Sequence, residues 1–85
     1  MRIRVTQQHI ANGERCVSQR CMISLAVRDA YPGATIRTDY AGVWVNGANF
    51  VMDDAIRQRL QAFDLNRTLA PFCFTLKDGK ATFLA

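Results

Sequence analysis

Two short turn signals, Asn46-Gly47 and Asp78-Gly79, constrain the fold of this 85-residue chain more than any other feature. Each stands between two runs in which apolar and polar residues alternate. Asn-Gly and Asp-Gly favour the two positive φ angles of a type I′ turn, which joins antiparallel strands in one register. The sequence therefore predicts two β-hairpins, and it also predicts which residues face each other across them.

The registers of the hairpins divide their residues between the two faces of a sheet. In the first hairpin, Val43, Val45 and Phe50 share the core face. Trp44 and Asn49 share the opposite face. In the second hairpin, the predicted inner residues are Phe72, Phe74, Leu76 and Phe83.

Two further segments, 2–6 and 34–39, alternate in the same way and are predicted to be strands. Arg2 and Arg4 point away from the core in the first of them, and Arg37 does so in the second. These arginines are therefore expected on the solvated face of the sheet.

Three segments carry helix signals, namely 7–12, 19–31 and 53–64. The second is apolar nearly all round, which predicts that it is the buried helix. The predicted N-caps are Thr6 for the first helix, Ser18 for the second, and Asp53 or its neighbour for the third. The residues predicted to be almost wholly buried are Leu25, Ile56, Leu60, Phe72 and Phe74.

The order of elements is β-α-α-β-β-β-α-β-β. Runs of strands with segregated helices are typical of the α+β class. We expect one α+β domain over 1–85, because a chain of this length forms a single core. Its sheet is expected to be mostly antiparallel, with about five strands and with two to three helices packed on one face.

Four side chains, His9, Cys16, Cys21 and Cys73, have the chemistry of zinc ligands. Structural zinc sites usually draw their tetrahedral ligands from closely spaced pairs such as Cys-x2-Cys, and this sequence contains no such pair. We therefore expect no metal and no other cofactor, and we expect the cysteines to be reduced thiols.

Two arrangements could suggest catalysis, and each has a structural explanation. Cys21 near a helix start, with His9 as its base, could form a nucleophile. A cysteine that opens an apolar helix is more often a small core residue. Asp53 and Asp54 could be paired acids, but at a helix start they suit capping and the helix dipole. We predict that the protein is not an enzyme.

The formal net charge is +4, from nine arginines and two lysines against seven acidic residues. Arg2, Arg4, Arg37 and Trp44 all point away from the core in their predicted strands, and they form the candidate binding face. Arginine beside an exposed aromatic is typical of protein interfaces and of nucleic-acid platforms. The alternative, that Trp44 packs under residues 66–71 and the arginines are separate solvated charges, stays open.

No apolar run approaches the ~20 residues that span a bilayer. The first residues also lack the apolar stretch of a signal peptide. We expect a cytoplasmic protein without a membrane partner, either a monomer or a small homo-oligomer.

Four segments together resemble a widespread group of small, uncharacterised proteins of bacteriophages and prophages. They are Val5–Ile10 with Gly13, Cys21–Ala30, Phe63-Asp64 and Pro71–Phe74. Members of that group often begin with VTxxHIxxG, carry a helix like CPIALAL, and finish on FD…PFxF. The similarity spans nearly the whole chain, although Met22 stands where the group often has proline.

The resemblance implies a phage protein that acts inside an infected or lysogenic bacterial host. Small phage proteins of this size include many anti-CRISPR proteins, which dock on an effector complex without catalysis. The resemblance therefore leads us to expect binding and inhibition of a host protein complex, with a CRISPR-Cas effector as the first candidate. The alternative is a basic nucleic-acid-binding accessory protein of the phage.

Overall fold

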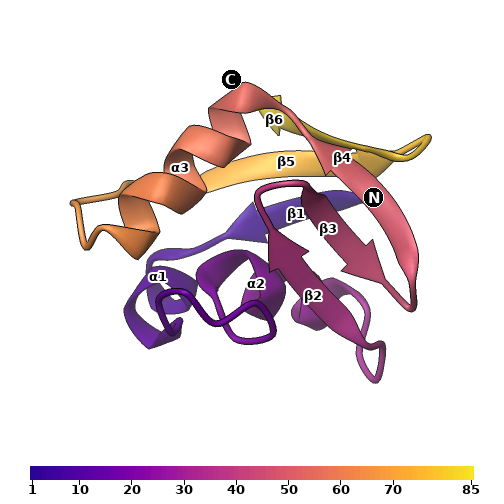
Figure 1. The fold of residues 1–85 in the computed structure, drawn as a ribbon, viewed down its shortest axis with the longest axis horizontal. Helices are drawn as coiled ribbons and strands as arrows, with labels where there is room; N and C mark the ends of the chain where they lie inside the picture. Colours follow the sequence, from indigo (N-terminus) through magenta and orange to yellow (C-terminus); the bar gives the residue numbers. More distant parts are fainter.

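The computed structural model describes all residues from 1 to 85, which form three helices and six strands (Figure 1). The strands are β1 (Arg2–Val5), β2 (Ile36–Asp39), β3 (Gly42–Val45), β4 (Ala48–Met52), β5 (Phe72–Lys77) and β6 (Lys80–Leu84). The helices are α1 (Gln7–Asn12), α2 (Met22–Ala30) and α3 (Asp54–Asp64).

All six strands form one sheet in the order β1-β5-β6-β4-β3-β2. The α+β class is confirmed, but the sheet has six strands and is mixed, because β4 and β6 run parallel. β5 runs opposite to β4, and the hairpin then reverses the chain, so that β6 runs with β4. The sheet curls, and α2 lies against both of its edge strands, β1 and β2 (Figure 1).

Both hairpins have the predicted register. Val45 pairs with Ala48 in the β3–β4 hairpin, and Leu76 pairs with Ala81 in the β5–β6 hairpin. The four turn residues all have positive φ angles, from 50° to 85°. The local turn chemistry therefore sets which side chains of these strands face the core.

One hydrophobic core of 18 buried residues lies between the inner face of the sheet and the helices. Ile56, Leu60, Phe72 and Phe74 are buried in it, as predicted. The prediction for Leu25 is wrong, because this side chain is partly exposed. The other apolar residues of α2 face the core, whereas Leu25 lines a shallow hollow beside α1.

The second helix begins later than predicted. It spans Met22–Ala30, with Cys21 rather than Ser18 as its N-cap. The carbonyl oxygen of Ser18 instead accepts hydrogen bonds from the Ser24 hydroxyl (2.6 Å) and from the Thr38 backbone N–H (2.9 Å). Ser18 therefore ties the loop before α2 to β2, and this role replaces the predicted cap.

The other two predicted N-caps are confirmed. The Thr6 hydroxyl accepts from the His9 backbone N–H (3.2 Å), and His9 Nδ1 accepts from the Thr6 N–H (3.0 Å). Asp53 Oδ1 accepts from the Ile56 N–H (2.9 Å), while its Oδ2 accepts from the Phe83 N–H of β6 (2.7 Å). Asp53 thus fixes the start of α3 against the sheet.

Truncation of a core side chain tests this packing. Leu60→Ala should lower the free energy of unfolding by roughly 2–5 kcal/mol, because it leaves a cavity in the core. Leu25→Ala is the matched control, and its loss should be less than half as large because Leu25 is partly exposed. Urea unfolding of both variants measures the difference, and equal losses would show that the orientation of α2 is wrong.

Candidate functional site

The sheet has an outer face, turned away from the helices, that carries most of its exposed side chains. The charged residues on this outer face are Arg2, Arg4, Arg37, Asp39, Lys77 and Lys80. Asp78 lies in the β5–β6 turn beside them. The helices lie on the opposite, inner side of the curled sheet (Figure 1).

The four residues predicted to bind lie on this one face, but they form two separate groups. Arg2 and Arg4 are on β1, at one edge of the sheet. Arg37 on β2 and Trp44 on β3 are at the opposite edge. Three strands, β5, β6 and β4, separate the groups, and the curl of the sheet turns them in different directions (Figure 1).

Arg37 and Trp44 pack against each other. They are cross-strand partners, and the Arg37 guanidinium lies 4.0 Å from the centre of the Trp44 ring. Arg37 Nη1 also donates to Asp39 Oδ2 at 3.3 Å. The stack leaves Trp44 partly exposed, and it holds a large apolar surface and a guanidinium in a fixed arrangement.

Two cations on the outer face were not among the predicted binding residues. Lys77 and Lys80 face each other across the end of the β5–β6 hairpin. The Asp78-Gly79 turn predicts that pairing, so the position of both lysines follows from the sequence. That the lysines lie near Arg2 could not be predicted in this way, because it depends on the pairing of β1 with β5, two strands far apart in the chain.

The net charge of the molecule is concentrated on the outer face. With its hairpin turn, this face holds five cations and two carboxylates, a net charge of +3. The remaining six arginines and five acidic residues contribute +1, which completes the total of +4. The helical side is therefore close to neutral, and the outer face attracts anions.

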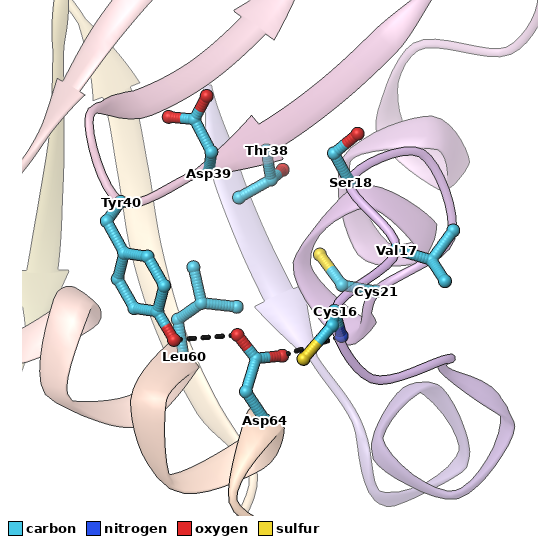
Figure 2. Close-up of a pocket in the computed structure, with 9 residues that line it drawn as sticks. All are labelled: Cys16, Val17, Ser18, Cys21, Thr38, Asp39, Tyr40, Leu60 and Asp64. Carbon is cyan, nitrogen blue, oxygen red and sulfur yellow. Dashed lines mark hydrogen bonds between the residues drawn. The ribbon is translucent and has the colours of Figure 1, made fainter.

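A second feature is a hollow of about 250 Å³ between the loop before α2, the end of β2 and α3 (Figure 2). Several of its polar groups are bonded within the protein, including the Asp39 and Asp64 carboxylates and the Thr38 hydroxyl. Asp64 Oδ2 accepts a hydrogen bond from the Tyr40 hydroxyl (2.6 Å), and Asp64 Oδ1 accepts one from the Cys16 backbone N–H (3.0 Å) (Figure 2). Asp64 thus joins three segments, and we interpret the hollow as a structural junction.

Partial burial and the hydrogen bond to Asp64 raise the pKa of Tyr40 from 10.0 to about 12. The neutral phenol is therefore favoured in the folded state. Below pH 10 the neutral phenol makes its full contribution to the free energy of unfolding. That contribution is lost as the pH rises from 10 towards 12.

The candidate catalytic residues are not assembled. His9 Nε2 lies 2.6 Å from Asp29 Oδ2 on α2, while the buried Cys21 thiol donates to the Ser24 hydroxyl at 3.6 Å. His9 and Cys21 also line different hollows. No three His, Cys, Asp or Glu side chains are grouped as metal ligands would be.

Comparison of the chain with protein-family models, with curated proteins and with solved structures finds no match in any of the three. None of the helices combines the length and the apolar character that a membrane span requires.

Replacement of Tyr40 tests the junction at the hollow. Tyr40→Phe should lower the free energy of unfolding by about 1 kcal/mol at pH 7, because a hydrogen bond to a carboxylate is lost at a largely exposed site. It should also reduce the loss of stability between pH 10 and 12. Tyr31→Phe, the matched control, should change neither quantity. Urea unfolding at several pH values measures both quantities. A Tyr40→Phe variant whose free energy of unfolding falls between pH 10 and 12 as much as that of the wild type would contradict the role of Tyr40.

Proposed function

We propose that this chain is a binding protein without catalytic activity, which attaches to an acidic macromolecular surface through the outer face of its sheet. The observation that carries the proposal is the charge of +3 on that face, against +1 on the rest of the molecule. Complementary charge steers association and fixes orientation. The Asp64 carboxylate and the Tyr40 hydroxyl in the hollow are bonded to the protein itself, which supports a binding role over a catalytic one.

The resemblance to small phage proteins supports a host protein complex as the target, and a CRISPR-Cas effector is the first candidate. An interface of standard size buries about 800 Å² on each partner. That area is about a sixth of the 4928 Å² surface of this protein. One face of so small a domain can therefore cover a working surface of a much larger complex.

The Arg37–Trp44 stack has the composition of an interface hot spot. Arginine and tryptophan are enriched at such positions, where truncation typically costs about 2 kcal/mol or more. Arginine also offers planar, multiple donors to carboxylates. The basic charge disfavours mimicry of DNA, which needs an acidic surface.

Truncation of Trp44 tests the proposal. Trp44→Ala should weaken binding to a purified CRISPR effector complex at least about 30-fold, which corresponds to a loss of 2 kcal/mol. The fold should persist, because the side chain lies outside the core. Arg37→Glu should weaken binding more than Arg37→Ala, because an acidic partner repels the new carboxylate. Surface plasmon resonance gives the affinities, and a melting curve checks each variant.

Arg67→Ala is the control, because Arg67 is an exposed cation on the helical side. It should leave the affinity unchanged. If Trp44→Ala binds normally while Arg67→Ala does not, the interface lies on the helical side. If Trp44→Ala unfolds, Trp44 is a core residue. Either outcome rules out the outer face as assigned here.

A further inference from the structure

Four cations from three strands lie along β1 and the β5–β6 hairpin, in one region of the outer face. Arg2 and Arg4 lie on β1, and Lys77 and Lys80 face each other across the β5–β6 hairpin. Arg2 pairs with Thr75, two residues before Lys77, so that all these side chains share one face of the sheet. All four cations are exposed, and together they form the four-cation cluster.

No ion pair joins a carboxylate to this cluster, and Asp78, in the turn between Lys77 and Lys80, leaves it a net charge of +3. The four ion pairs of the molecule all involve other residues. The Arg2 guanidinium makes only a long contact of 3.9 Å with the Cys73 thiol. Lys77 and Lys80 stand directly opposite each other, and like charges so placed destabilise a hairpin. The cations of the cluster therefore repel one another and create a positive potential. A bound anion would reduce both the repulsion and the potential.

The cluster is an extended row of cations rather than a single point of charge. Arg4 pairs with Cys73, and Lys77 lies four residues further along β5, a distance of about 13 Å at the usual strand rise. A nucleic-acid strand carries one negative charge on each phosphate, so each of the four cations can neutralise one phosphate of a backbone that runs along the cluster. Thr75 and Thr82 lie between the cations and add hydroxyl donors, which commonly contact phosphate oxygens.

We infer that the four-cation cluster binds the phosphate backbone of a nucleic acid. No aromatic side chain lies within the cluster to stack on bases. Trp44 lies near the other edge, where Arg37 covers one face of its ring. Binding at the cluster is therefore independent of sequence, because backbone contacts carry no base information.

This inference rests on the proposed function in one respect, because it assigns a ligand to part of the same outer face. CRISPR effectors hold a guide RNA paired with its target strand. In such a complex the four-cation cluster contacts nucleic-acid backbone, while the Arg37–Trp44 stack contacts protein. The two groups of outer-face residues then serve two parts of one target.

Fluorescence anisotropy with labelled duplex DNA, single-stranded DNA and duplex RNA of mixed sequence tests the inference. For four phosphate contacts, the slope of log affinity against log salt should be about −3.6 for duplex DNA and about −2.8 for a single strand. Lys77→Gln with Lys80→Gln should reduce the duplex slope by about 2 and weaken binding roughly tenfold or more. The slope and the relative affinities show which nucleic acid the cluster prefers.

The charge-matched control is Arg20→Gln with Arg67→Gln, which removes two exposed cations from the helical side. It should keep the wild-type slope and affinity. Equal losses in both double variants would show that only the total charge matters, and the inference would be wrong. Equal affinity for poly-glutamate would likewise exclude a phosphate site and favour an acidic protein surface.

Lys77→Glu separates binding from folding. The variant creates an opposite-charge pair with Lys80, so its melting temperature should rise while nucleic-acid binding is lost. If the cluster variants leave nucleic-acid binding intact, the inference fails. Capture of the effector complex by the Arg37–Trp44 stack would then still support the proposed function. Failure of both measurements would remove both proposals.

Discussion

The short parallel pairing of β4 with β6 is the interaction on which the rest of this structure depends. It joins two three-stranded units, β2-β3-β4 and β6-β5-β1, into one sheet. The Val51 N–H donates to the Gly79 carbonyl (2.8 Å), and the Asp53 N–H donates to the Ala81 carbonyl (3.1 Å). The Asp53 carboxylate then caps α3 and accepts the Phe83 N–H. One residue therefore links the junction of the sheet to the helix that covers it.

A single curled sheet has one covered face and one free face, and this division organises the charges. The helices close the inner face, where the 18 core residues lie. Apart from Arg37, which bonds to Asp39, the cations on the outer face are then left to solvent or to a partner. Lys77 and Lys80 illustrate the consequence, because the turn that fixes their register also brings two like charges together. Two like charges placed in this way lower the stability of the fold. A role in binding an anion would explain why both lysines are present.

Much of this fold could be predicted from the sequence, and the rest depends on contacts between distant segments. The hairpin registers and the caps at Thr6 and Asp53 follow from local turn and capping chemistry. The parallel strand pair does not, because no local pattern specifies which strands meet. Ser18 was predicted as a cap, but its carbonyl is held by β2 and α2. The two outer-face groups were predicted as one surface, since alternation gives the face of a residue but not its strand's place in the sheet.

Binding at the outer face is tested most directly by ¹H–¹⁵N spectra of the folded protein titrated with a short DNA duplex at low salt. The expected result is a set of shifts in the amides of residues 2–4 and 73–82. The amides of α1 and α2, and those around Tyr40, should stay unchanged. Shifts concentrated in the helices, with β1, β5 and β6 unaffected, would contradict the assignment of the outer face as the binding surface.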